Sequence, residues 1–218
     1  MPSSFTSKLP NLDTSIFTEM SMMANQYQAI NLSQGFPEFD TPAFLKDKIN
    51  EAISEGKNQY SPSNGLPDLL TQIAQMVHRQ YQTTLDDTQK IDGLKNITIT
   101  SGATEALWVA IQVLVRPDDE VIIFDPAYDS YEPAIELAGG TCRHIALDAP
   151  SYSINWALVE QTINAKTRAI IVNSPHNPTG SILSESDLNT LQALVEKYNL
   201  YVISDEVYEH MTFDGLRH

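Results

Sequence analysis

The hydrophobic residues in the second half of the chain follow two alternating patterns. Short apolar runs rich in β-branched residues predict strands, and the segments between them have the apolar spacing of helices. The predicted strands are residues 97–100, 120–124, 141–147, 168–173 and 200–204, and the predicted helices are residues 104–115, 130–138, 156–163 and 185–198. This alternation predicts an α/β fold in which helices cover a parallel or mixed sheet.

The predicted helix at residues 185–198 has the clearest boundaries. Ser184 is suited to cap its first turn, and Asp187 stands where a capping box needs a second polar side chain. The apolar residues of this helix form one stripe, which comprises Leu188, Leu191, Leu194 and Val195. We therefore expect the helix to pack on the sheet.

The first part of the chain shows a different pattern. It predicts helices at residues 44–55 and 66–81, no strand, and an N-terminal arm that contains proline and serine. The change of pattern predicts a division into residues 1–42 and residues 43–218. After Ser204 no further helix or strand is predicted that would cover the sheet, so we expect the domain to be interrupted there.

Composition and charge limit the class of protein and its partners. The chain has 218 residues, of which 42% are hydrophobic and 19% charged, as is typical of a folded globular protein. Its formal charge of −15 opposes binding to nucleic acid or to anionic membranes, although the start of one helix can still bind an anion. No leader or membrane-spanning stretch is evident, and a lone cysteine, Cys142, forms no intrachain disulfide, so we expect a cytoplasmic protein.

Residues 99–107, Ile-Thr-Ser-Gly-Ala-Thr-Glu-Ala-Leu, place a turn of small residues between a predicted strand and a predicted helix. Gly102 and Ala103 allow a ligand to approach the backbone, the first N–H groups of a helix lack intrahelical partners, and Thr104 adds a hydroxyl. This geometry suits a phosphate. An ordinary helix start capped by Ser101 or Thr104 is the simpler explanation of the motif taken alone.

Two further polar segments follow predicted strands. Residues 173–180, Asn-Ser-Pro-His-Asn-Pro-Thr-Gly, leave one strand, and Asp205 and Glu206 stand at the end of the next. Ligands bind at the carboxyl ends of strands in α/β sheets. A plain turn also explains the first segment, and a carboxylate that caps the next turn also explains the second. The five histidines show no metal-ligand spacing, and no nucleophile motif is present, so we expect neither a metal site nor a catalytic triad.

In this order, the segments resemble those of the class I/II aminotransferases, pyridoxal-phosphate-dependent enzymes of fold type I. The likeness extends to residues 31–42 with Gln-Gly-Phe-Pro-Glu-Phe, residues 58–65 with Asn-Gln-Tyr-Ser-Pro-Ser-Asn-Gly, and residues 124–131 with Phe-Asp-Pro-Ala-Tyr-Asp-Ser-Tyr. Gln-Gly-Phe-Pro-Glu-Phe and Asp-Glu-Val-Tyr-Glu-His are most similar to the branch of methionine and kynurenine/glutamine aminotransferases.

The resemblance implies a fold and a division into domains. The fold is the large domain of fold type I, in which a mixed, mostly parallel sheet lies between helices, incomplete at its C-terminus. Residues 1–42 would form an N-terminal arm and a segment of the small domain, and residues 43–218 would form the domain that binds pyridoxal 5′-phosphate. The family often has cis peptides before such prolines, so Asp125–Pro126 and Asn177–Pro178 are candidates.

The resemblance also implies which residues bind the phosphate end of the cofactor. Gly102, Ala103 and Thr104 would bind the phosphate, which agrees with the anion site expected at this helix start. Tyr128 would stack on the pyridine ring. Tyr60 would reach the phosphate of a neighbouring subunit, so we expect a homodimer.

The remaining implied contacts lie at the other end of the cofactor. Asn177 and Tyr208 would hydrogen-bond its phenolic oxygen, Asp205 would face the ring nitrogen, and Gly35 would lie beside the substrate carboxylate. A carboxylate about 4 Å from the nitrogen stabilises the protonated ring by about 4 kcal/mol at an effective dielectric constant near 20. The protonated ring accepts electrons when the α-proton of the substrate leaves.

The lysine that forms the Schiff base lies, in the family, downstream of the Asp-Glu-Val-Tyr segment, and this chain ends before it. Lys57, in Ser-Glu-Gly-Lys, precedes the phosphate segment and is interpreted as a solvated charge. We therefore expect no catalytic residue in this chain and no transamination by this polypeptide alone.

The implied activity of the parent protein is transfer of the amino group of methionine or an aromatic amino acid to a 2-oxo acid. A β-lyase of the same family that acts on cysteine conjugates would use the same cofactor residues. A noncatalytic fragment or dimerisation module, and an α/β domain that binds another phosphate ligand, are the alternatives outside this chemistry.

Overall fold

The computed structural model of the chain describes residues 6–10, 12–35, 37, 39–81, 91–216 and 218. The chain divides into two compact units, one formed by Met1–Asp13 with Ser101–His218 and the other by Thr14–Thr100. The boundary expected at residue 42 lies inside the second unit, and the division of the complete protein into domains stays a prediction. Within the Gln-Gly-Phe-Pro-Glu-Phe segment, Phe36 and Glu38 lie outside the described residues.

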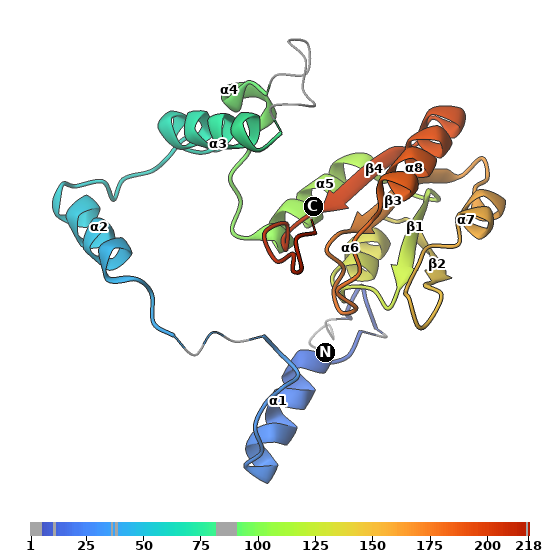
Figure 1. Cartoon of the computed structure of the whole chain (residues 1–218), viewed down its shortest axis with the longest axis horizontal. Helices are drawn as coiled ribbons and strands as arrows, with labels where there is room; N and C mark the ends of the chain where they lie inside the picture. The colour runs from blue at the N-terminus through green and yellow to red at the C-terminus, as the bar shows by residue number, and fades with distance from the viewer. Residues whose placement is uncertain (1–5, 11, 36, 38, 82–90, 217) are drawn as a thin grey trace, which may run out of the picture. The chain divides into compact units, whose positions relative to one another are not determined.

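The first unit is built on a four-stranded sheet (Figure 1). Its strands are β1 Glu120–Asp125, β2 Thr141–Ala146, β3 Thr167–Asn173 and β4 Tyr201–Asp205. Their order across the sheet is β2-β1-β3-β4, and each pairing among the described residues is parallel. The four strands lie within a residue of their predicted bounds, and the α/β class is confirmed.

Helices cover both faces of this sheet (Figure 1). On one face lie α5 Ala103–Leu114 and α6 Tyr131–Leu137, and on the other lie α7 Trp156–Thr162 and α8 Glu185–Tyr198. Along the chain, α6 connects β1 to β2, α7 connects β2 to β3, and α8 connects β3 to β4. Parallel neighbours need such crossover connections, because the chain must return to the same edge before each new strand begins.

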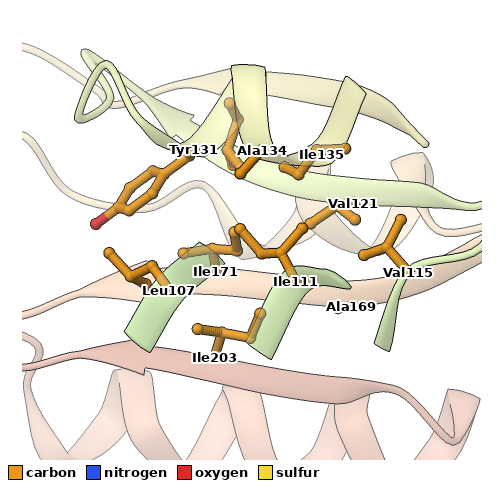
Figure 2. Close-up of a cluster of buried hydrophobic side chains, with 11 residues drawn as sticks. Leu107, Ile111, Val115, Val121, Tyr131, Ala134, Ile135, Ala169, Ile171 and Ile203 are labelled. Carbon is orange, nitrogen blue, oxygen red and sulfur yellow. The ribbon is translucent and has the colours of Figure 1, made fainter. Parts of the chain in front are cut away.

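Each face of the sheet has its own hydrophobic core. Beneath α5 and α6, the core includes Ile111, Val121 and Ile171, each at most 1% exposed (Figure 2). Ile122 belongs to the core beneath α7 and α8, because successive residues of a strand point to opposite faces. A strand buried on both faces must be apolar throughout, which explains the continuous apolar runs of β1 and β3.

The start of α8 forms the predicted capping box. The Ser184 hydroxyl accepts a hydrogen bond from the Asp187 N–H at 3.2 Å, and the Asp187 carboxylate accepts one from the Ser184 N–H at 2.8 Å. Leu191 and Leu194 are buried as expected, but Leu188 is 51% exposed, so its assignment to the core is wrong. Leu188 lies about 90° around the helix from the direction shared by the two buried leucines.

The second unit is helical in its described part. It contains α1 Ile16–Tyr27, α2 Ala43–Ser54, α3 Pro67–Gln80 and α4 Gly93–Asn96. The predictions of α2 and α3 are confirmed, whereas α1 lies in the segment for which the sequence predicts only an N-terminal arm. Ile16, Met20, Met23 and Tyr27 have the spacing of an apolar helical stripe, although no residue of this helix is buried. No helix in the described part of the chain is long and apolar enough to cross a lipid bilayer.

Residues 97–100 form no strand among the described residues, and that prediction is wrong. The backbone is extended at Ile97, and the Ile99 N–H donates a hydrogen bond to the Asn64 carbonyl at 3.0 Å. An extended segment becomes a strand only where a neighbouring strand accepts its backbone hydrogen bonds. The sequence indicates that the segment is extended, but it does not indicate whether a neighbouring strand lies beside it.

Glu120 connects the start of β1 to two neighbouring segments. It is 6% exposed, and its carboxylate accepts hydrogen bonds from Arg143 Nη2 on β2 at 2.6 Å and from Asn164 Nδ2 at 2.7 Å. Arg143, followed by Asn164, lowers the pKa of Glu120 from 4.5 to about 2. A lowered pKa in the folded state stabilises the fold above pH 4.5, and this contribution is lost as the pH falls toward 2.

We expect Glu120→Gln to lower the free energy of unfolding of the complete protein by about 1–3 kcal/mol at pH 7, because the ion pair is lost while Arg143 remains. The difference from the wild type should shrink as the pH falls below 4.5. Denaturant unfolding between pH 7 and pH 3 measures both effects. Glu160→Gln is the control, since Glu160 pairs with Lys197 at the surface, where solvent screening keeps the contribution of an ion pair small. Equal losses in the two variants, or a difference independent of pH, would contradict the assignment.

Candidate cofactor site at the carboxyl edge of the sheet

The strand order creates a crevice at one edge of the sheet. From β1 the chain moves to β2 on one side, and then returns past β1 to β3 on the other. Such a reversal is a topological switch point, and ligands of open α/β sheets bind there, outside the carboxyl ends of the strands. The segments that leave β1, β3 and β4 at this edge contain Tyr128, Asn177 and Tyr208.

A cavity of about 220 Å³ lies at this edge. Its walls come from the start of α5 and from the segments that follow β1, β3 and β4. The lining residues are Ala103, Thr104, Leu107, Tyr128, Asn173, Asn177, Asp205, Val207 and Tyr208. The fold thus brings to one cavity the residues of the first unit that the sequence assigns to a cofactor site, except Gly102. Gly102 directly precedes the lining residue Ala103.

The start of α5 has a glycine at its N-cap position. Its N-cap residue is Gly102, with φ 84°, a conformation that L side chains rarely adopt, and no side-chain cap is found there among the described residues. A Cβ added to Gly102 would meet no described atom within 4 Å. Neither Ser101 nor Thr104 caps the helix, so the explanation of this motif as an ordinary capped start is wrong. The first N–H groups of a helix and its dipole favour an anion at such an end.

Asp205 lies at the end of β4 and is 8% exposed. Its Oδ2 accepts a hydrogen bond from the Tyr131 hydroxyl at 2.7 Å, and its Oδ1 accepts one from the Val207 N–H at 3.3 Å. The carboxylate therefore supports the following turn and also lines the cavity. The described lining contains no lysine, arginine or histidine, so a cationic group on a ligand would balance this buried charge.

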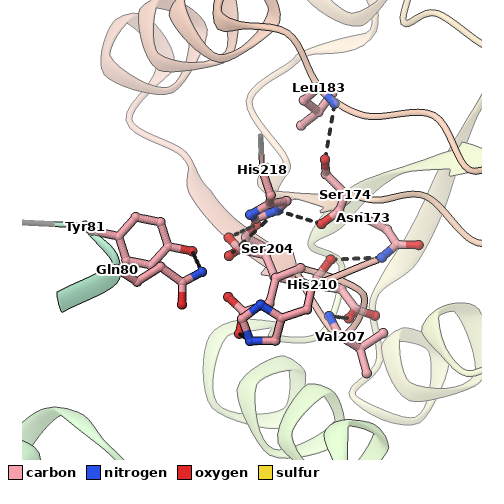
Figure 3. A network of polar contacts seen from close by, with 12 residues as sticks. Gln80, Tyr81, Asn173, Ser174, Leu183, Ser204, Val207, His210 and His218 are labelled. Carbon is pink, nitrogen blue, oxygen red and sulfur yellow. Dashed lines mark hydrogen bonds and ion pairs between the residues drawn. The ribbon is translucent and has the colours of Figure 1, made fainter. Parts of the chain in front are cut away.

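Asn173 joins the loop after β3 to the end of β4. Its Oδ1 accepts a hydrogen bond from the Asn177 N–H at 2.7 Å. Its Nδ2 donates one to the Asp205 carbonyl at 2.8 Å, which Figure 3 shows as a dashed line. The Ser174 N–H donates to the same carbonyl at 3.1 Å. Because the parallel register pairs Asn173 with Asp205, these bonds fix Asn177 relative to the carboxylate. The segment is therefore more than a plain turn.

Tyr128 forms the wall that follows β1, and Tyr131 packs against it. The Tyr128 hydroxyl lies 3.2 Å from Thr104 Oγ1, which connects this wall to the start of α5. Its ring packs edge-on against Tyr131, with centroids 5.6 Å apart and an interplanar angle of 79°. These contacts fix the orientation of the Tyr128 ring. The Asp125–Pro126 and Asn177–Pro178 bonds are cis, as the resemblance suggested.

The other predicted site residues lie in the second unit. Gly35 is exposed, and Tyr60 is 102% exposed. The predicted roles of Gly35 at the substrate carboxylate and of Tyr60 at the phosphate of a neighbouring subunit stay predictions.

Two groups of potential metal ligands in the described part of the chain escaped the sequence-based expectation, and one of them is Glu206, Glu209 and His218. Glu132, Cys142 and His144 place ligand atoms within 4.8 Å of one another, and the cysteine and histidine share a face of β2 because they are two residues apart. His144 already lies between carboxylates, with Nδ1 3.1 Å from Asp125 and Nε2 3.4 Å from Glu132. Burial, and then nearby carboxylates, raise the pKa of the Cys142 thiol to about 12, so this cysteine is a poor ligand and nucleophile. The expectation of no metal site stays a prediction.

The fold and the cavity together define an α/β ligand-binding domain with an anion site on one wall and a buried carboxylate on another. Residues 27–218 match the family model of the class I and II aminotransferases. The match covers most of the chain, and the chain belongs to this family, whose cofactor is pyridoxal 5′-phosphate. The resemblance drawn from the sequence motifs is thereby confirmed.

Curated relatives point to particular branches of the family. The chain is 45% identical over 212 residues to a methionine aminotransferase of Escherichia coli (strain K12), an alignment that covers 97% of this chain and 53% of the relative. It is 34% identical over 222 residues to human kynurenine–oxoglutarate transaminase 3, covering 97% of this chain and 48% of the relative. The chain thus spans about half the length of the curated relatives it matches.

Solved structures share the fold. The Escherichia coli protein with a methionine aminotransferase function aligns with a TM-score of 0.89 at 45% identity, over 96% of this chain and 53% of that one. The N-succinyldiaminopimelate aminotransferase of Mycobacterium tuberculosis aligns with a TM-score of 0.90 at 37% identity, over 99% and 55%. The fold is that of the fold type I aminotransferases, and the described part of its sheet is parallel rather than mixed.

We expect Asn173→Ala to lower the free energy of unfolding of the complete protein by about 1–3 kcal/mol, because it removes two hydrogen bonds that hold the loop after β3. Asn173→Asp should lose less, since it keeps the acceptor for the Asn177 N–H. Denaturant unfolding measures the losses, and Asn189→Ala, on the exposed face of α8, is the control. A loss for Asn173→Ala no larger than that of the control would show that these bonds do not stabilise the loop.

Proposed function

We propose that the complete protein is a pyridoxal-phosphate-dependent aminotransferase that moves the amino group of methionine or an aromatic amino acid to a 2-oxo acid. The observation that carries this proposal is the cavity lined by the start of α5 and by the Asp205 carboxylate. These groups are complementary to the two polar ends of the cofactor, a phosphate anion and a ring nitrogen that takes up a proton.

The start of α5 is suited to the phosphate. Gly102 and Ala103 leave the backbone accessible, Thr104 offers a hydroxyl, and the helix is 12 residues long. An anion near the N-terminus of such a helix is stabilised by about 0.3–1 kcal/mol, and by up to about 2 kcal/mol in a partly buried geometry. This local attraction acts within the first turn, so the net negative charge of the chain does not oppose it strongly.

Asp205 is suited to the ring nitrogen. A carboxylate that is 8% exposed interacts more strongly with a nearby cation than a solvated one does, because less water screens the charge. A protonated ring nitrogen would supply the cation that the described cavity lining lacks. The same interaction would hold the proton on that nitrogen.

The remaining cavity residues would orient the ring. Tyr128 would stack on it, and its edge-on contact with Tyr131 holds it in place for this role. Asn177 and Tyr208 would hydrogen-bond the phenolic oxygen, and Asn173 fixes the loop that carries Asn177. When bound, the cofactor supplies the electron-withdrawing ring that makes removal of the substrate α-proton possible.

The relatives support the choice of substrates. The 45% identity to a methionine aminotransferase favours methionine, and the 34% identity to a kynurenine transaminase favours an aromatic amino acid as donor.

We include in the proposal Gly35 beside the substrate carboxylate and a homodimer in which Tyr60 reaches the neighbouring phosphate. The exposure of Tyr60 supports this dimer. We also place the protein in the cytoplasm, where its single thiol, on Cys142, remains reduced.

The test uses the complete protein incubated with pyridoxal 5′-phosphate. We expect an absorbance band of the bound cofactor, and transfer of the amino group from methionine or an aromatic amino acid to a 2-oxo acid, detected by chromatography of both products. Release of pyruvate and ammonia from a cysteine conjugate, without transfer, would identify a β-lyase instead. Absence of the band and of both reactions would overturn the proposal. The expectation that the 218-residue chain alone does not transaminate stays a prediction for the same assay.

We expect Asp205→Asn to lower kcat by about a thousandfold, because loss of about 4 kcal/mol of interaction with the ring corresponds to that factor in rate. Glu206→Gln is the matched control, since this adjacent carboxylate is exposed and does not line the cavity. Steady-state kinetics of the two variants make the comparison. Similar rates for Asp205→Asn and the wild type would show that Asp205 does not act on the ring.

A further inference from the structure

Tyr131 is a buried residue that contacts two of the proposed cofactor ligands. It is the first residue of α6, is 4% exposed, and belongs to the core between α5, α6 and the sheet. Figure 2 shows its ring among the apolar side chains, with the hydroxyl oxygen at the margin of the cluster. The hydroxyl donates a hydrogen bond to Asp205 Oδ2 at 2.7 Å, and the ring packs edge-on against Tyr128.

The hydroxyl of Tyr131 acts as a permanent donor. Burial, and then the hydrogen bond to the Asp205 carboxylate, raise the pKa of this phenol well above its usual range. The phenol therefore keeps its proton at neutral pH and donates it in the hydrogen bond to the carboxylate. Since the donor never changes, the direction of the hydrogen bond is fixed.

The carboxylate of Asp205 is held from two sides. Tyr131 binds one oxygen, and the Val207 N–H binds the other at 3.3 Å. A side chain without such donors is free to rotate about its terminal bond. Of the two donors, only Tyr131 comes from another element of the fold, so it fixes the carboxylate relative to the wall that contains Tyr128.

We propose that Tyr131 is a positioning residue, which holds the Asp205 carboxylate and the Tyr128 ring in the mutual orientation that a planar aromatic cofactor requires. The inference rests on the proposed function, because the orientation matters only if these two residues meet the same ring. Tyr131 itself does not line the cavity, so it acts through its neighbours.

The experiment compares Tyr131→Phe with Tyr198→Phe in the complete protein. Tyr198 also hydrogen-bonds a carboxylate, that of Glu160 at 3.1 Å, but at the exposed surface of α8, so it is a matched control for loss of a hydroxyl. The dissociation constant of pyridoxal 5′-phosphate is measured by fluorescence, and ring protonation by the ¹⁵N chemical shift of cofactor labelled at the ring nitrogen. Thermal melting of the cofactor-free protein reports stability separately.

For Tyr131→Phe we expect weaker cofactor binding by about tenfold or more, the effect of one lost hydrogen bond to a charged group. The ¹⁵N shift should move toward that of the unprotonated ring, kcat should fall, and the KM for the amino acid should change by less than about threefold. Tyr198→Phe should change none of these. In the Asp205→Asn background the effect of Tyr131→Phe should vanish, because Tyr131 acts through that carboxylate.

The outcomes separate the two proposals. A wild-type protein that does not bind pyridoxal 5′-phosphate overturns the proposed function. A wild type that binds, with a Tyr131→Phe variant of unchanged dissociation constant and ¹⁵N shift, overturns the role of Tyr131 alone. Effects that persist in the Asp205→Asn background, or a Tyr131→Phe protein that fails to fold, assign Tyr131 to the core and also overturn that role.

Discussion

The parallel pairing of β1, β3 and β4 is the constraint on which the candidate site depends. Parallel neighbours all end at the same edge of a sheet, so the polar residues that follow them are brought together although they are far apart in the sequence. The reversal of strand order between β1 and β3 opens a crevice at that edge. The buried apolar residues of β1 and β3 maintain this pairing, because a shift by one residue would turn each side chain toward the wrong face.

The charge of the cavity follows from the same arrangement. The start of α5 contributes partial positive charge from its backbone, and β4 contributes the buried carboxylate of Asp205. A ligand that is anionic at one end and cationic at the other matches both walls. Such local fields decide binding within a few ångströms, whereas the formal charge of −15 acts on the chain as a whole and is screened by salt.

The sequence predicted the elements that have strong local signals. Apolar runs located β1 to β4, and the Ser184 and Asp187 pair located the start of α8, because those signals lie within a few residues. The ordered motifs also indicated Asp205 and Thr104 as partners at one site. The strand at residues 97–100 and the burial of Leu188 were wrong, since each depends on what lies opposite the segment in the folded chain.

The residues that the sequence did not identify are those proposed to act through their neighbours. Asn173 stands in a polar loop and Tyr131 in a sequence motif, and neither has a distinctive spacing that indicates its role. Their importance lies in long-range hydrogen bonds, from Asn173 to the end of β4 and from Tyr131 to the Asp205 carboxylate. A ligand contact can be carried over from a motif, but the groups that hold it in place depend on the packing of elements distant in sequence. Both kinds of residue must be in position before the cavity matches a rigid, planar ligand, so the groups that hold the lining residues in place belong to the site as well.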